Sequence, residues 1–160
     1  MKSDKSYIGQ RAEAQAYLVW SDLGVPLSEW DASHGDGPDL QVSVHESGSL
    51  PAFLGVEVKG TVDLTQWLTL HHVLRRPMAE RLRAEVSSLE YPVALTLVDV
   101  ETLDTFVGWV KSPNELASPQ HMPEGTGTIE MMQAERATLQ AMVSEARRWY
   151  DSRWRYGGRA

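Results

Sequence analysis

The sequence predicts an α/β fold with a mixed central β-sheet flanked by helices. Two stretches, near residues 39–45 and 52–59, alternate apolar and polar residues with the period of two that indicates half-buried strands. Residues 93–98 are apolar apart from one threonine, which is typical of a central strand buried on both faces. At this length we expect one domain over residues 1–160, ending in a basic, aromatic helix and tail at about 130–160.

Three helices are predicted around the sheet. The first covers residues 8–23, where apolar residues recur near helical spacing until Gly24 and Pro26 end the helix. The second covers residues 77–89 and begins with a proline, a residue favoured at the first helical position. The third covers residues 130–150, with its apolar residues, methionines included, facing inward.

The remaining segments are predicted to be a strand and loops. Residues 106–110 follow a short turn and are expected to pair with the strand at 93–98. Residues 64–74 fit a helix and a strand about equally well. Prolines, glycines and serines break up residues 111–129, so we expect a long loop or a lid there.

The first two strands are expected to form a hairpin, because Glu46 to Ser49 between them are turn residues. If Val44 lies opposite Leu54, then Asp39 falls opposite Lys59. A slip of two residues would change these partners but not the face on which each side chain lies.

Asp39, Glu57 and Lys59 therefore emerge together on the polar side of the hairpin. Opposed residues lie roughly 5 Å apart and diagonal ones about 7–8 Å. Two carboxylates at that spacing suit Mg²⁺, which prefers oxygen ligands and keeps several waters. We expect the carbonyl of Val58 to lie near the ion, and Lys59 to orient a water or to stabilise developing charge on a phosphate.

These residues resemble the signature of the PD-(D/E)XK, or restriction-endonuclease-like, nuclease superfamily. Pro38-Asp39 and, after a gap, Glu57-Val58-Lys59 match that signature, and the order of elements over roughly residues 7–110 is similar to a branch of small bacterial domains. The resemblance implies a restriction-endonuclease-like fold, Mg²⁺ as cofactor with Mn²⁺ as a substitute, and Asp39, Glu57 and Lys59 as the catalytic set.

An acidic residue of the first helix completes the set that the resemblance implies. Glu13 takes this position, as a second-metal or water-positioning carboxylate, although Gln10 stands where related domains often have a glutamate. The alternative for Glu13 is an ordinary exposed helix acid. Asp36 competes with Asp39 for the metal, but its surroundings favour a turn residue.

Composition narrows the class of protein further. There is no cysteine, which excludes a disulfide framework and a thiolate metal site. No apolar run approaches a membrane span and the N-terminus does not resemble a signal peptide, so we expect a cytoplasmic protein without a membrane partner. The net charge is −7, which is unfavourable for a simple nucleic-acid binder.

The basic residues are concentrated in two places. From Met131 onward the chain has six arginines and three acids, a net charge of +3. Arg153 and Arg155 alternate with aromatics, a pattern that binds single-stranded nucleic acid; the alternative is a helix end whose aromatics pack on the core or on a partner subunit. The helix at 77–89 carries Arg81 and Arg83 against Glu80 and Glu85, which indicates a solvated, charge-paired face. The alternative is an edge that contacts phosphates, for which Arg75 and Arg76 are the candidates.

The predicted function is therefore that of a metal-dependent endonuclease acting on nucleic acid, DNA in preference to RNA. Phage defence, or service as the nuclease subunit of a larger assembly, would fit a protein of this kind. A homodimer or a partner protein subunit could supply missing affinity. The alternative is a non-catalytic scaffold or interaction subunit of the same fold, which the overall acidity favours.

Overall fold

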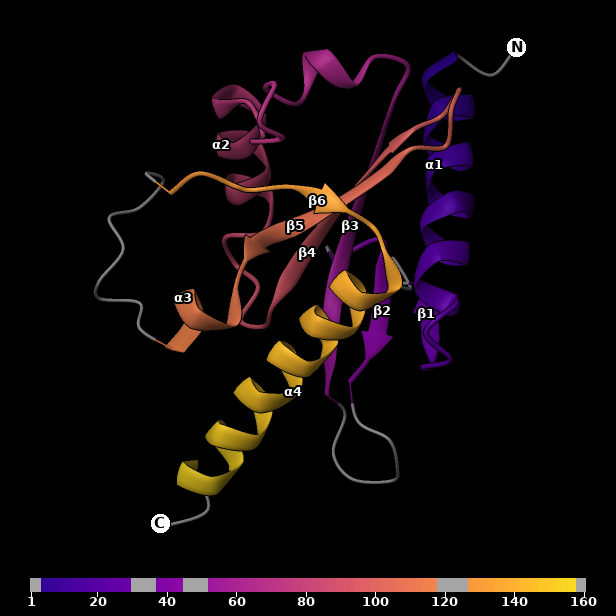
Figure 1. Ribbon diagram of the computed structural model, residues 1–160. Coiled ribbons are helices and arrows are strands. Elements are labelled where there is room, and N and C mark those ends of the chain that lie inside the picture. The colour runs from indigo at the N-terminus through magenta and orange to yellow at the C-terminus, as the bar shows by residue number, and fades with distance from the viewer. Residues whose placement is uncertain (1–3, 30–36, 45–51, 118–126, 158–160) are drawn as a thin grey trace.

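The structure, a computed structural model, describes residues 4–29, 37–44, 52–117 and 127–157; of these, the side chains of residues 4–6 and 154–157 lie outside the description. Figure 1 shows the elements around one sheet. In chain order they are α1 (Asp4–Ser21), β1 (Leu27–Glu29), β2 (Leu40–Ser43), β3 (Phe53–Thr61), the 3-10 helix η2 (Leu64–Gln66), α2 (Arg76–Glu85), β4 (Val93–Asp99), β5 (Thr105–Lys111), α3 (Pro113–Ala117), β6 (Met132–Gln133) and α4 (Arg136–Gly157).

The sheet has six strands in the order β1-β2-β3-β4-β5-β6. Neighbouring strands are antiparallel except β3 and β4, which are parallel and lie at the centre. Every residue of β4 is buried, as the apolar run at 93–98 predicted. The mixed α/β class is thus confirmed.

The hairpin of β2 and β3 is confirmed, but its expected register is wrong by two residues. Leu54 pairs with Val42 rather than with Val44, and Val56 pairs with Leu40. The apolar residues keep their face, because a shift of two preserves the alternation. Continued by one residue, this register would set Asp39 across from Glu57 instead of from Lys59.

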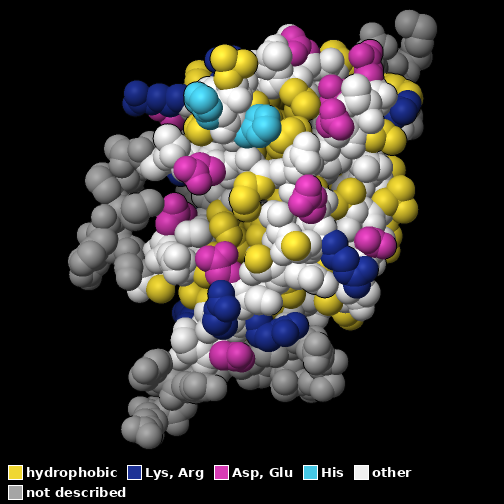
Figure 2. Space-filling view, in the orientation of Figure 1, with side chains coloured by type: hydrophobic (Ala, Val, Ile, Leu, Met, Phe, Trp, Pro, Cys, Tyr) yellow, Lys and Arg dark blue, Asp and Glu magenta, His cyan; other side chains and the backbone are white. Residues whose placement is uncertain are grey.

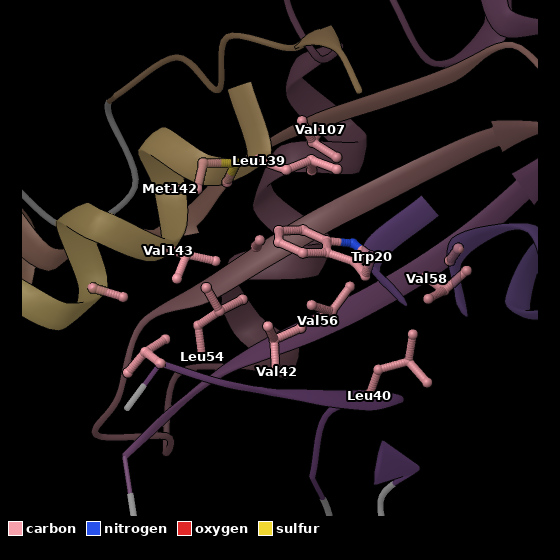
Figure 3. Packing of buried hydrophobic residues seen from close by; sticks show 14 of the residues in the cluster. Trp20, Leu40, Val42, Leu54, Val56, Val58, Val107, Leu139, Met142 and Val143 are labelled. Carbon is pink, nitrogen blue, oxygen red and sulfur yellow. The ribbon is translucent and has the colours of Figure 1, made fainter. Parts of the chain in front are cut away.

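One face of the sheet is covered by α1 and α4. Alternate residues of the central strands meet small and apolar side chains of both helices in a buried cluster (Figure 3). Trp20 of α1 is completely buried there, and its indole Nε1–H donates a hydrogen bond of 2.9 Å to the Thr96 hydroxyl of β4. The polar atom of each residue thereby receives a partner, as buried polar groups require.

The opposite face is covered by α2. Ala79, Leu82 and Val86 pack there against Leu95, Leu97 and neighbouring apolar residues. Because side chains on a strand alternate between faces, Glu57 and Lys59 of β3 point to the α2 side, while Val56 and Val58 point to the α1 side.

The predicted helix bounds need correction at several ends. α1 runs over Asp4–Ser21 rather than 8–23, and α2 ends at Glu85 rather than at residue 89. Two serines follow Val86 there, and serine competes for backbone hydrogen bonds outside helices. The helix predicted over 130–150 begins only at Arg136, because Met132 and Gln133 pair with β5 as a strand.

Parts of other predictions lie outside the described residues. Within the predicted loop at 111–129, residues 113–117 form the short helix α3, and residues 118–126 are not described, so the lid remains a prediction. The turn at 46–49 and Asp36 are likewise outside the described ranges.

Replacing Lys111 with methionine should lower the free energy of unfolding by about 1–3 kcal/mol. The Lys111 ammonium donates hydrogen bonds to the carbonyls of Val86, Ser87 and Leu89, which follow the last turn of α2. The substitution would leave these acceptors without their cation. Urea unfolding measures the change, with Arg76→Met as the control, because Arg76 forms an exposed ion pair with an expected contribution below about 0.5 kcal/mol. Equal losses in both variants would contradict the assignment.

Candidate functional site

The candidate site lies where β2 and β3 face the end of α2. Glu57 and Lys59 stand two residues apart on β3, so their side chains share one face. The Lys59 ammonium is 3.4 Å from a carboxylate oxygen of Glu85, the last residue of α2. Asp39 directly precedes β2, the strand beside β3. The three residues expected at the site are therefore grouped around these two neighbouring strands.

Asp39 is held by the backbone of β3. Its Oδ2 accepts a hydrogen bond of 2.7 Å from the amide N–H of Val58, and the side chain is half-buried. Burial raises the pKa of Asp39 above its ordinary value, and the nearby charge of Glu85 adds to that rise, whereas the Val58 amide and the Lys59 charge oppose it. The hydrogen bond holds one carboxylate oxygen of Asp39 against the backbone of β3.

Glu57 is the most unusual side chain of the site. It is only 9% exposed, and it has no hydrogen bond or ion pair among the described residues. Burial, and then the negative charge of Asp39, raise its pKa from 4.5 to about 7. A buried carboxyl group without a partner is costly to ionise, so a cation placed between it and Asp39 would be strongly favoured.

Glu13 belongs to α1, which covers the other side of the sheet. The backbone of α1 comes close to β3 because Gly60 has no side chain: a Cβ there would lie 2.8 Å from the Ala12 Cβ. The Glu13 side chain is exposed, and burial, followed by the charges of Asp39 and Glu29, raises its pKa. Its carboxylate is thus within electrostatic reach of Asp39, and its role at a second metal or a water stays a prediction.

Two residues of the site were missed by sequence reasoning. Glu85 was expected to pair with an arginine of its own helix, yet it pairs with Lys59. Tyr91 lies between α2 and β4, and the Glu57 charge contributes to its raised pKa. Nothing in the sequence near either residue indicates the site, because only the packing of α2 and β4 on β3 brings them there.

The donor set can be compared with the needs of a divalent ion. Within the described ranges, no group of three or more histidine, aspartate or glutamate side chains is arranged to hold a metal. Two carboxylates and a backbone carbonyl are nevertheless enough for Mg²⁺, which keeps several of its own waters. Asp39 and Glu57 could supply the two carboxylates. That the Val58 carbonyl is a further ligand stays a prediction.

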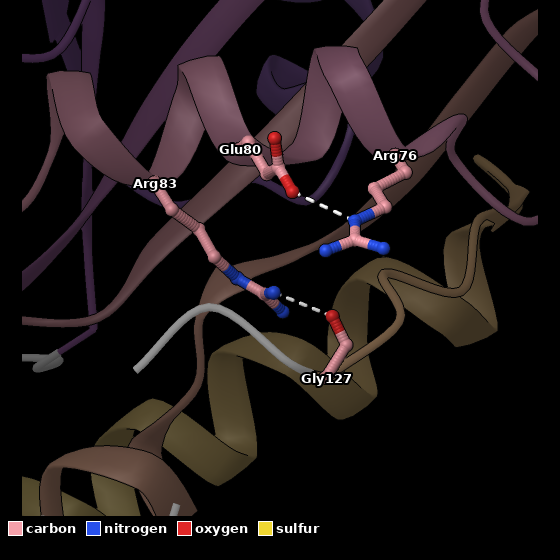
Figure 4. Close-up of polar contacts among 4 residues, drawn as sticks. All are labelled: Arg76, Glu80, Arg83 and Gly127. Atoms are coloured by element: carbon pink, nitrogen blue, oxygen red, sulfur yellow. Dashed lines mark hydrogen bonds and ion pairs between the residues drawn. The ribbon is translucent and has the colours of Figure 1, made fainter. Parts of the chain in front are cut away.

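The predicted nucleic-acid contacts are not brought to this site. The Nε of Arg75 donates to the Thr65 carbonyl, and Arg76 pairs with Glu80 at 2.7 Å (Figure 4). Arg76 begins α2 and Glu85 ends it, so roughly 14 Å of helix separates them. Arg83 of the same helix donates to the Gly127 carbonyl and forms no pair with Glu80. The charge pairs expected within α2 are therefore partly wrong.

The basic residues of the C-terminal helix lie elsewhere. The Arg153 guanidinium stacks over the Trp149 ring at 4.8 Å, and Trp149 is buried. This favours the reading in which an aromatic of this helix packs on the core. The Arg155 side chain is outside the description. On the face shown in Figure 2, described basic side chains are interspersed with acidic and apolar ones.

The raised pKa of Glu57 predicts how stability depends on pH. The folded protein holds the Glu57 proton up to about pH 7, whereas the unfolded chain releases it near pH 4.5. Glu57 therefore contributes its full stabilisation of the fold below about pH 4.5. It is lost as the pH rises towards 7, an effect on the order of 3 kcal/mol.

Urea unfolding of the metal-free protein between pH 4 and pH 8 tests this prediction. Glu57→Gln should remove that part of the decline, so the two stability curves should diverge as the pH rises. Asp39 and Glu13, whose pKa values are also raised, contribute in the same direction in both proteins. Curves that stay parallel would contradict the assignment.

No described helix is both long and apolar enough to cross a membrane.

Comparison with known proteins identifies no relative of this chain. Models of protein families, curated proteins and solved structures were all compared with the chain, and none matches it.

Proposed function

We propose that this protein is a metal-dependent nuclease of the PD-(D/E)XK type, which hydrolyses phosphodiester bonds, in DNA in preference to RNA. The observation that carries the proposal is the buried Glu57 carboxyl, unpaired among the described residues, beside Asp39 and on the same face as Lys59. A fold gains no stability from this arrangement alone, because ionising the two neighbouring acids costs free energy. A bound cation would repay that cost.

Asp39 and Glu57 would hold the ion, and Mg²⁺ with Mn²⁺ as substitute suits their oxygen ligands. When bound, such an ion polarises a phosphoryl oxygen and lowers the pKa of a bound water. The Lys59 ammonium orients the attacking water or stabilises the charge that develops on the phosphate. Glu57 must be ionised to act as a ligand, so metal affinity should increase as the pH rises through about 7.

Glu85 forms an ion pair with Lys59, so a phosphate of the substrate would have to compete with Glu85 for the Lys59 ammonium. The ion pair is partly exposed, with 31% and 41% of the two side chains accessible. Exposed pairs contribute at most about 1 kcal/mol, so a phosphate could displace Glu85 at little cost.

The overall charge of the chain does not by itself favour binding to nucleic acid. The net charge is −7, and Arg75 and Arg76 lie at the far end of α2. A second copy of the chain or a partner subunit would supply the missing positive surface, as in a nuclease component of a larger assembly or of a phage-defence system. This same charge balance favours the second candidate, a non-catalytic scaffold of the same fold.

Cleavage assays distinguish the two candidates. The purified protein is incubated with single- and double-stranded DNA and RNA, with Mn²⁺, with Mg²⁺ and with a chelator. A nuclease should cut at least one substrate in a metal-dependent manner, and Lys59→Ala prepared in parallel controls for contaminating nuclease. If no substrate is cut and calorimetry detects no Mn²⁺ binding, the scaffold is favoured.

A further inference from the structure

Tyr91 occupies a slot on the site's face of the sheet. The amide of Gly55 donates a 2.9 Å hydrogen bond to the carbonyl of Pro92, which fixes the chain next to Tyr91 beside β3. A Cβ at Gly55 would lie 2.9 Å from Cε2 of Tyr91 and 3.0 Å from Cγ of Pro38. The Tyr91 ring also contacts the Phe53 ring, with centroids 4.7 Å apart. The absence of a side chain at Gly55 therefore leaves room for this ring.

The position of the ring brings Tyr91 to the site. Phe53, Gly55 and Glu57 are alternate residues of β3, so they follow one another along a single face. The ring lies against Gly55, the middle residue of these three, and Pro38, which lies against the same glycine, precedes Asp39. Tyr91 thus lies on the face of β3 that carries Glu57, and the charge of Glu57 acts on it.

The Tyr91 hydroxyl is buried and has no hydrogen-bond partner among the described residues. Burial, and then the Glu57 charge, raise the pKa of Tyr91 to about 12. At neutral pH the hydroxyl is therefore protonated and can donate. Buried donors without an acceptor are rare in folded proteins, and each calls for an explanation.

Glu57 lacks a partner as well, and it is an acceptor. We propose that Tyr91 is a positioning residue whose hydroxyl donates a hydrogen bond to the Glu57 carboxylate when that group is ionised. The bond would orient the carboxylate towards the ion, as outer-shell donors do for metal ligands in general. The inference rests on the proposed function only in treating Glu57 as a ligand; the hydrogen bond itself needs no metal.

Three charged side chains affect the pKa of the Glu57 carboxyl. Asp39 at the start of β2 and Glu85 at the end of α2 raise its pKa, and Lys59 on β3 lowers it. A hydrogen bond to the ionised form lowers a carboxyl pKa. Removing the Tyr91 hydroxyl, with these charges unchanged, should therefore raise the pKa of Glu57 further.

The test is an NMR titration of the Glu57 side-chain carboxyl carbon in the metal-free protein, in the wild type and in Tyr91→Phe. Phenylalanine keeps the ring against Phe53 and removes only the donor. Tyr150→Phe is the matched control, because the Tyr150 hydroxyl donates to the Phe53 carbonyl at 2.7 Å rather than to Glu57. We expect Tyr91→Phe to strengthen proton binding at Glu57 by about three- to tenfold, and the control to leave it unchanged.

Mn²⁺ binding measured by calorimetry on the same three proteins separates the two proposals. We expect Tyr91→Phe to weaken Mn²⁺ binding about tenfold, and Tyr150→Phe to leave it unchanged. An unchanged Glu57 titration in Tyr91→Phe would overturn the positioning role even if the wild type binds Mn²⁺. A shifted titration in a wild type that binds no Mn²⁺ would instead retain the hydrogen bond and refute the metal site.

Discussion

Replacing Lys59 with alanine should reduce cleavage by about 10²–10³-fold, because a positioned cation acts on charge that develops only in the transition state. The loss should appear in turnover rather than in substrate affinity. Metal binding should persist, since Lys59 lies beside the carboxylates and does not ligate the ion. Turnover is measured under saturating Mn²⁺ with whichever substrate the wild type cuts.

The stability of the Lys59→Ala protein should change little. Lys59 is partly exposed, and its ion pair with Glu85 belongs to a class that contributes at most about 1 kcal/mol. Glu85→Gln is the matched control, because it breaks the same ion pair but keeps the lysine. If Glu85→Gln lost as much turnover as Lys59→Ala, the effect would come from the ion pair and not from the cation. Near-wild-type cleavage by Lys59→Ala would refute the proposed role.

Replacing Asp39 with asparagine should weaken Mn²⁺ binding by about 10²-fold or more, since outer-shell changes alone cost about 10–100-fold. Cleavage should fall with it and recover in part at high Mn²⁺ concentration. The metal-free fold should not suffer, because the asparagine oxygen can still accept the hydrogen bond from the Val58 amide. Its stability at pH 8 should even rise, since the raised pKa of Asp39 means that its charge disfavours the folded state.

Asp63→Asn is the control for this prediction. Asp63 is an aspartate on the segment that follows β3, and its carboxylate accepts hydrogen bonds from the backbone and the hydroxyl of Thr65. Those bonds lower its pKa, which is the opposite of the shift at Asp39. Isothermal calorimetry with Mn²⁺ should therefore show no loss in Asp63→Asn. Equal affinities in both variants and the wild type would exclude Asp39 as a ligand.

The sheet could be predicted well from local sequence. The alternation of Leu40 and Val42 with polar residues, and the apolar run from Val93, depend only on which faces are buried, and those patterns are visible in the sequence. The register of β2 against β3 could not be predicted, because alternation determines the face of a side chain but not its partner across the ladder.

The short strands and the helix ends were harder to predict from the sequence for a similar reason. β1 and β6 have three and two residues, too few for any periodicity, and they exist because β2 and β5 offer edges to pair with. Methionines near residue 131 suit a helix or a strand equally well. Tertiary pairing decides such cases, and a single sequence does not display it.

The residues of the candidate site likewise fall into two groups, those that the sequence predicted and those that only tertiary packing reveals. Asp39, Glu57 and Lys59 could be proposed from strand parity and from the resemblance. Glu85 and Tyr91 come from α2 and from the segment before β4, and only the packing of these segments brings them to β3. Their contributions, a partner for Lys59 and the proposed donor to Glu57, depend on contacts between residues far apart in the chain.

The central claim is that Asp39 and Glu57 together bind one divalent ion. Anomalous diffraction at the manganese absorption edge, from a crystal grown with Mn²⁺ at pH 8, tests it most directly. The account predicts a peak within about 2–2.6 Å of an oxygen of each carboxylate, on the α2 side of β3. No peak between Asp39 and Glu57, while Glu57 remains unpaired, would contradict it.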